Sequence, residues 1–210
     1  TEDQISAHFN MIDDFSKYID ENTTDPQLYF GRALHYTLVQ DYANAIDDLR
    51  KAIVVDEKYS MAYFVLGIIY SRLYELNENV LKEYNPRNVL EKDRLESLNS
   101  EIKPLTSMPT EKTDYEQALV NYTKLIEIEP DFVYAYYNRA ELRLSNKDYR
   151  AAILDYNEAI RRDAQFAEAY YNRGLARLYM DDKERGLEDL RKAGELGITS
   201  AYSIIKRMSN

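Results

Sequence analysis

The chain contains no cysteine, no tryptophan and only two histidines, His8 and His35. Without cysteine there is neither a disulfide framework nor a thiolate metal site. Neither histidine has a second histidine, a cysteine or a carboxylate at the i+4 spacing of a helical metal pair. We therefore expect no metal and no cofactor.

Long apolar runs are also missing. The longest, roughly residues 61–70, is about half the length needed to span a bilayer. The N-terminal segment TEDQISAHFN lacks the charged-then-apolar layout of a signal peptide, although a chain that begins with Thr1 is compatible with a signal that has been removed. We expect a soluble protein without a membrane span, and the sequence leaves the cytoplasm and the periplasm both open.

Positive charge is in deficit. Lys and Arg number 27 against 37 Asp and Glu, which gives a formal net charge of -10. Such a chain repels phosphate backbones and anionic headgroups, and its basic pairs are scattered along the sequence. Nucleic acid is therefore not an expected partner.

No arrangement of catalytic groups is visible. No serine lies in a nucleophile elbow, and neither histidine belongs to a recognisable motif. The paired acids Asp13-Asp14, Asp47-Asp48 and Glu188-Asp189 recur at one place in a repeating pattern, so we interpret them as the solvated face of a helix. Asp181-Asp182 lacks a calcium-loop pattern and is interpreted as a turn. We expect no enzyme activity and no catalytic residue.

What the sequence does contain is a 34-residue repeat. The segment at 135–160, AYYNRAELRLSNKDYRAAILDYNEAI, recurs at 169–194 as AYYNRGLARLYMDDKERGLEDLRKAG. A second pair has the same phase, because Tyr29, Ala33 and Tyr36 step by 34 onto Tyr63, Gly67 and Tyr70. There the matching second helix begins only at Asp114, 39 residues late, so one repeat carries an insertion at 76–113.

These positions resemble the tetratricopeptide repeat (TPR) family, in a bacterial style. The resemblance implies an all-α, right-handed superhelical solenoid of antiparallel helix pairs, with small residues where the two helices of a pair, A and B, cross closely. We assign that packing role to Gly67, Ala118, Ala140, Ala152 and Gly174.

We expect one domain, 1–210, with about four repeats. Its parts are a half repeat at 4–22, repeat 1 at 26–56, repeat 2 at 60–131 with the insertion, repeat 3 at 133–164, repeat 4 at 167–197 and a capping helix at 199–209. The half repeat is a helix B without its helix A; a lone cap and a chain cut from a longer array both produce this pattern, and we favour the cut. In the insertion, apolar spacing predicts that helix A lengthens toward Pro86 and that a further helix covers about 87–103.

The resemblance also predicts a peptide-binding groove on the concave face. Its fifth and sixth repeat positions, together with one acid from repeat 3, give the candidate site Phe30, Phe64, Tyr137, Asn138, Glu141, Tyr171 and Asn172. Aromatic rings offer apolar pockets, and asparagine can hydrogen-bond an extended backbone. The alternative is that the rings pack on their neighbours and the asparagines bond within the repeats.

A carboxylate clamp is disfavoured, because Phe30, Tyr137 and Glu141 stand where that subgroup needs basic residues. Arg72, Arg143 and Arg177 are possible anion contacts or salt-bridge partners. We expect a protein–protein interaction module that binds a peptide or a partner protein. The alternative is a structural spacer of a longer repeat protein with no ligand of its own. The insertion either binds a partner or covers its own repeat.

Overall fold

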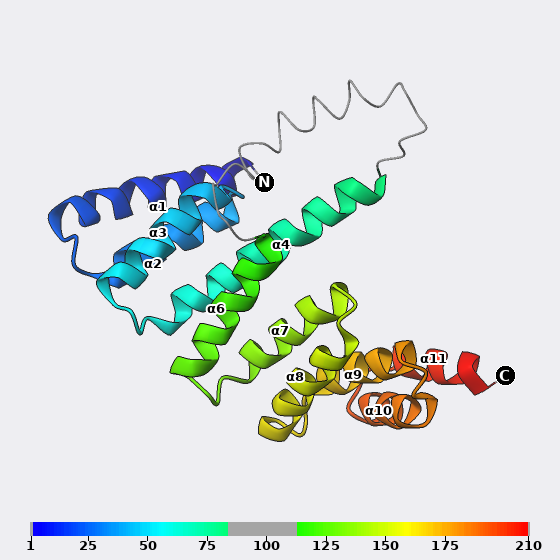
Figure 1. The fold of residues 1–210 in the computed structure, drawn as a ribbon. Coiled ribbons are helices and arrows are strands. Elements are labelled where there is room, and N and C mark those ends of the chain that lie inside the picture. Colours follow the sequence, from blue (N-terminus) through cyan, green and yellow to red (C-terminus); the bar gives the residue numbers. More distant parts are fainter. Residues whose placement is uncertain (1, 84–112, 210) are drawn as a thin grey trace. The chain divides into compact units, whose positions relative to one another are not determined.

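A computed structural model of the protein describes residues 2–83 and 113–209, which are helical apart from short turns (Figure 1). The helices are α1 (Glu2–Glu21), α2 (Pro26–Leu38), α3 (Tyr42–Val55), α4 (Ser60–Glu83), α6 (Asp114–Ile128), α7 (Val133–Ser145), α8 (Tyr149–Arg162), α9 (Ala167–Tyr179), α10 (Lys183–Glu195) and α11 (Ser200–Ser209). The all-α prediction is confirmed, as are the helix pairs expected for repeats 1, 3 and 4.

The helices form two compact units, residues 1–121 and 122–210. In the first unit, α1 packs on α2, α2 on α3 and α3 on α4. In the second unit, α7 packs on α8, α8 on α9, α9 on α10 and α10 on α11. Within each unit, these helices contact their neighbours in the chain, which is how repeat arrays bury the apolar faces of short helices.

Small residues allow the close crossing within each pair. Ala118, Ala140 and Ala152 have no exposed surface, and Gly67 and Gly174 are buried as well. A Cβ added at Gly174 would lie 3.0 Å from the carbonyl oxygen of Gly186 on α10. The packing role predicted for these five residues is confirmed.

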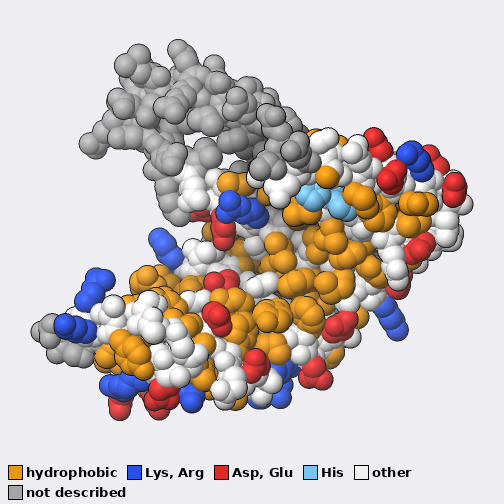
Figure 2. Space-filling model, turned by 180° about the vertical axis from the view of Figure 1, so that it is seen from behind, with side chains coloured by type: hydrophobic (Ala, Val, Ile, Leu, Met, Phe, Trp, Pro, Cys, Tyr) orange, Lys and Arg blue, Asp and Glu red, His pale blue; other side chains and the backbone are white. Residues whose placement is uncertain are grey.

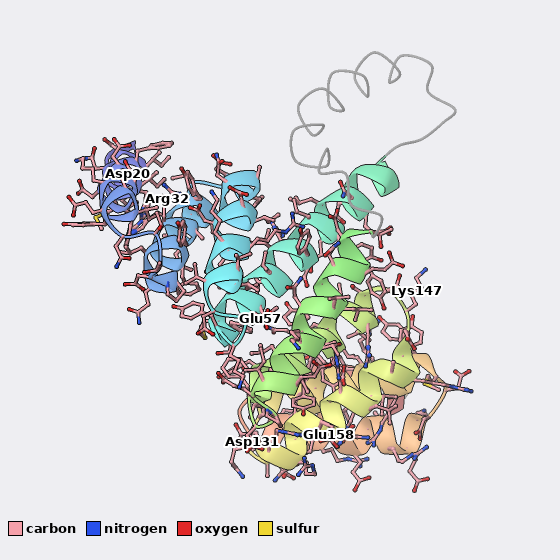
Figure 3. All side chains as sticks on the ribbon, turned by 60° about the vertical axis from the view of Figure 1, so that its left-hand side comes forward. Asp20, Arg32, Glu57, Asp131, Lys147 and Glu158 are labelled. Atoms are coloured by element: carbon pink, nitrogen blue, oxygen red, sulfur yellow. The ribbon has the colours of Figure 1, made fainter. Side chains whose placement is uncertain are left out.

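The turn from helix A to helix B has one geometry in three repeats. Its middle residue has a positive φ, 63° at Gln40, 62° at Lys147 and 60° at Asp181, although none of these is glycine. The aspartate that follows forms the N-cap of helix B, and in repeats 1 and 3 its carboxylate accepts the backbone N–H three residues later. Asp181-Asp182 is thus a turn, as predicted. Figure 3 shows Lys147 in the α7–α8 turn.

A recurrent arginine bridge joins three helices in the same way in three repeats. Arg32 on α2 donates to both carboxylate oxygens of Asp48 on α3, at 2.6 and 2.8 Å, and to Ser16 Oγ on α1 at 2.9 Å (Figure 3). In the second unit, Arg139 bonds Asp155 and Thr123 in this manner, and Arg173 bonds Asp189 and Asn157. In every case the partners lie 16 residues before and 16 residues after the arginine.

The bridges correct one prediction. Asp48 and Asp189 were expected on a solvated face, but their exposed fractions are 2% and 3%. The expectation holds for their neighbours Asp47 and Glu188, which are exposed. The prediction holds for Asp13-Asp14, both of which are exposed. In the other two pairs it missed that the second member turns inward, where an arginine neutralises it.

The insertion begins where α4 extends beyond the length of an ordinary helix A. α4 has 24 residues against 13 in α2, so the predicted lengthening is confirmed up to Glu83. Near its end, Asn77 Nδ2 donates to Asp114 Oδ2 at 2.8 Å, and the rings of Tyr74 and Tyr115 pack at 5.4 Å. The helix predicted at 87–103 lies outside the described residues.

Candidate functional site

Three groove residues of the second unit and Tyr156 on α8 form one polar cluster. Asn172 on α9 donates through Nδ2 to Glu141 Oε1 on α7 at 2.7 Å and to Tyr137 Oη at 3.1 Å. Tyr156 on α8 also donates its hydroxyl to Glu141 Oε1. Glu141 is thus the acceptor at the centre of the cluster, and three helices meet at its carboxylate.

The cluster holds both phenols in the neutral form. Burial raises the pKa of Tyr137, and the negative charges of Glu141 and Glu168 raise it further against the opposing hydrogen bond from Asn172. Burial likewise raises the pKa of Tyr156, and Glu141 adds to the shift. A protonated phenol donates to a carboxylate, so at neutral pH these groups satisfy one another.

A row of aromatic rings lies beside the cluster. The ring of Phe166, in the turn before α9, lies 4.7 Å from that of Tyr137 and 5.5 Å from that of Tyr134. The ring of Tyr137 also packs against Tyr156 at 6.0 Å. The sequence analysis did not include Phe166 and Tyr156 in the site, because neither lies at a family groove position on helix A.

The two asparagines of the candidate site differ in their side-chain hydrogen bonds. Asn172 is held by Glu141 and Tyr137, as in the alternative interpretation of the groove. Asn138 is half-buried, and its side chain forms no hydrogen bond within the described part of the chain. Its amide, with two donors and an acceptor, is therefore available to a ligand. Tyr171 is half-buried against the core around Leu190.

The first unit contains the two phenylalanines of the candidate site. Phe30 on α2 is half-buried, and its ring packs edge-on against Tyr59 at 5.4 Å. Phe64 on α4 is also half-buried. At Gly31, next to Phe30, an added Cβ would lie 2.5 Å from the Phe15 ring, so α1 covers this position of α2. We keep the two parts of the candidate site separate, one in each unit.

The arginines considered as anion contacts have internal partners. Arg143 Nη1 lies 2.7 Å from Asp155 Oδ2, and Arg177 Nη1 lies 2.7 Å from Asp189 Oδ2. Arg72 is exposed and reaches Glu75 at 3.4 Å. In repeats 3 and 4, two arginines therefore share one buried aspartate, and the salt bridges lie within a repeat.

The structure brings the two histidines together. His8 Nδ1 on α1 and His35 Nδ1 on α2 are 3.0 Å apart, a hydrogen bond in which one ring donates and the other accepts. Figure 2 shows the pair at the surface among hydrophobic side chains. They are 27 residues apart in the chain, so no local spacing rule connects them. Among the described residues, no group of three or more His, Cys, Asp or Glu side chains is placed to hold a metal ion.

Family models identify the repeats. A model described as "TPR repeat" matches residues 110–146 and 140–180, and one described as "Tetratricopeptide repeat" matches 167–196. Residues 110–196 are thus identified as tetratricopeptide repeats. No curated protein matches the sequence of the chain.

Solved structures support the same fold for the chain as a whole. "Crystal structure of MamA" has 19% identity and a TM-score of 0.64, with 91% of this chain and 89% of that chain covered. "MamA 41-end from Desulfovibrio magneticus RS-1" has 14% identity and a TM-score of 0.61, with 92% and 95% covered. At these identities the likeness concerns the TPR fold alone. In the described part of the TPR chain, no helix has the length and apolar character needed to cross a membrane.

Proposed function

We propose that this tetratricopeptide repeat protein is a protein–protein interaction module that holds a segment of a partner polypeptide against α7 and α9. Helical repeat modules of this kind are in general non-catalytic and present extended surfaces to other proteins. The proposed binding residues of this unit are Tyr137, Asn138, Glu141, Tyr171 and Asn172. Phe30 and Phe64 are proposed separately, as contact residues of the first unit.

The observation that carries this proposal is the state of Asn138. It is half-buried beside Tyr137, yet its amide has no partner among the described residues. A half-buried amide without a partner is costly unless water or a ligand satisfies it, and an extended peptide offers a carbonyl and an N–H in the geometry that asparagine pairs with.

The surrounding cluster supports this role by fixing the surface. Asn172 and Tyr156 hold Glu141, and Phe166 holds the Tyr137 ring from the side. Side chains that are ordered before binding lose little conformational entropy when a ligand arrives. The cluster therefore provides a rigid wall, and Asn138 provides the free hydrogen-bonding group.

The test is a peptide selection with a matched counter-variant. Peptides displayed on phage are selected on the wild-type chain, and the best binders are titrated by fluorescence polarisation against Asn138→Ala and Asn157→Ala. Asn157 serves as control because it bonds Arg173 through its side chain and does not belong to the groove. We expect Asn138→Ala to weaken binding about fivefold or more and Asn157→Ala to leave the affinity within about twofold.

A structural spacer is the alternative function. Several groove side chains are already occupied by one another, which is what a spacer without a ligand would show. Two outcomes would reject the groove at α7 and α9 and favour the spacer. Either the selection recovers no binder, or the binders have equal affinity for the wild type and for Asn138→Ala.

A further inference from the structure

A cavity of about 580 Å³ lies between α9 and α10, on residues that the proposed groove does not use. Five of its nine lining residues are cationic, namely Arg173, Arg177, Arg185, Arg191 and Lys192, and three are acidic. The lining thus has two more cations than carboxylates (5 − 3 = 2), in a chain whose formal net charge is -10.

Two of these cations belong to the framework. Arg173 and Arg177 share the single carboxylate of Asp189, whose side chain is 4% exposed. Burial lowers the pKa of Arg177, and Arg173 and Arg185 lower it further against the opposing effect of Asp189. Two guanidinium groups on one aspartate leave a positive charge at the base of the cavity.

The outer cations differ in how well they are neutralised. Arg185 pairs with Asp182 at 2.6 Å, whereas Lys192 reaches Glu195 at only 3.7 Å, with 43% and 64% of the two side chains exposed. Arg191 is exposed and has no ion pair within the described residues. Glu188, the remaining carboxylate of the lining, is exposed on α10.

The other repeats hold only some of these cations. In repeat 3, Arg139, Arg143 and Asp155 reproduce the inner arrangement of Arg173, Arg177 and Asp189, but Ala151, Asn157 and Glu158 stand 34 residues before Arg185, Arg191 and Lys192. In repeat 1, Arg32, Arg50 and Lys51 stand at the positions of Arg173, Arg191 and Lys192, with Tyr36 and Asn44 at those of Arg177 and Arg185. Repeat 4 thus combines the two partial sets, and all five positions are cationic there.

We propose that the α9–α10 cavity is an anion-binding site for a carboxylate- or phosphate-bearing ligand. Guanidinium groups match both oxyanions through paired hydrogen bonds, and the surrounding ammonium and guanidinium charges add attraction. A cavity of this volume is larger than a single oxyanion needs, so the anionic group would be part of a larger molecule. The site is independent of the groove proposed on α7 and α9.

The experiment uses the full chain and two variants of equal net charge. Arg191→Gln with Lys192→Gln removes two cavity cations, and Lys147→Gln with Arg150→Gln removes two exposed cations near the α7–α8 turn. Inorganic phosphate and a blocked tri-glutamate peptide are titrated separately into each isotope-labelled protein, and amide shifts are followed by NMR. Thermal melting checks that both variants remain folded.

We expect saturable shifts at the amides of residues 185–192, and an affinity at least about fivefold weaker in the cavity variant than in the wild type. The control variant should retain the wild-type affinity within about twofold, and added salt should weaken binding. The tighter of the two probes identifies the source of the anion as a phosphate or a carboxylate. The absence of saturable shifts with both probes, or an equal loss in both variants, would overturn the proposal.

Discussion

Leu66 and Asn121 occupy the two positions at which the helix pairs of repeats 1, 3 and 4 hold an arginine and a buried aspartate. Both are themselves buried, with 3% and 7% of their surface exposed. The third position of the bridge, on the preceding helix B, holds Arg50, which donates to Tyr70 Oη at 2.9 Å. All three positions of the bridge thus differ from the other repeats in the repeat that carries the insertion. Because Asn121 replaces the aspartate, the loss of the arginine at position 66 leaves no buried carboxylate unpaired at this place.

Asn121→Asp should destabilise the protein by about 2–3 kcal/mol, because the new carboxylate is buried beside a leucine. Leu66→Arg should also destabilise it, since the new guanidinium has no carboxylate and lies near Arg50. The double variant should lose about 1–3 kcal/mol less than the sum of the two single losses, because it recreates the Arg–Asp pair of the other repeats. A urea-unfolding double-mutant cycle measures the coupling, and strictly additive losses would contradict it.

Asp189→Asn should lower the free energy of unfolding by about 3–5 kcal/mol, since it leaves Arg173 and Arg177 partly buried without their counter-ion. The neighbouring Glu188→Gln is the matched control, because Glu188 is exposed and has no ion pair among the described residues; it should change stability by less than about 0.5 kcal/mol. Chemical denaturation of both variants gives the comparison. Similar losses in the two would show that the bridge contributes little.

Lys147→Gly should stabilise the protein by about 0.5–1 kcal/mol, because glycine adopts the positive φ of 62° without the steric cost that lysine incurs. Replacement by glycine within a helix should have the opposite effect on stability. Glu188→Gly, in the exposed middle of α10, should destabilise by about 1 kcal/mol. Melting temperatures of the two variants check the signs, and destabilisation by Lys147→Gly would show that the lysine side chain contributes more than the turn geometry.

Acidification should destabilise the contact between α1 and α2. Burial lowers the pKa of His35 from its ordinary value of 6.5, and the nearby His8 lowers it further. The unfolded chain therefore binds the proton more readily than the folded one, so this contribution to stability is complete above about pH 6.5 and is lost as the pH falls through the folded-state pKa. His35→Asn, which retains a hydrogen-bonding group near Nδ1, should show a smaller drop in melting temperature between about pH 7.5 and 5.5. An unchanged drop would exclude His35 as the cause.

Glu141→Gln should lower the pKa of both Tyr137 and Tyr156, because a neutral amide no longer repels the phenolate. Burial remains, so the pKa values of Tyr137 and Tyr156 should both stay above the ordinary value of a tyrosine. Tyrosine labelled at Cζ reports each ionisation by NMR, and Glu184→Gln, an exposed residue on α10, serves as the control. If the tyrosine signals titrate identically in Glu141→Gln and in the wild type, Glu141 does not act on these phenols.

The sequence was sufficient to predict the elements that follow from a 34-residue period. The helix pairs, the close-packed small residues such as Ala140 and the lengthening of α4 all follow from recurrence and apolar spacing. Its limit was the direction in which polar side chains point. Asp47 and Asp48 are adjacent and chemically alike, yet one is exposed and the other is buried against Arg32.

The site shows the same limit. Family positions indicated Tyr137, Asn138 and Asn172, but they did not distinguish the asparagine held by Glu141 from the one without a partner. That difference depends on distances between neighbouring repeats, which a repeat period does not encode. The His8–His35 contact was missed for a related reason, since it joins two helices through residues with no common spacing.

The α4–α6 junction has a practical consequence. Asn77 and Asp114 are joined by a hydrogen bond, and Tyr74 packs on Tyr115, so the two helices are fastened to each other at the point where the insertion leaves and returns. Because the entropy of closing a loop grows only slowly with its length, a change in the length of the intervening chain adds little closure entropy. The contacts at the junction thus make the pairing of α4 and α6 largely independent of the length of the chain that connects them.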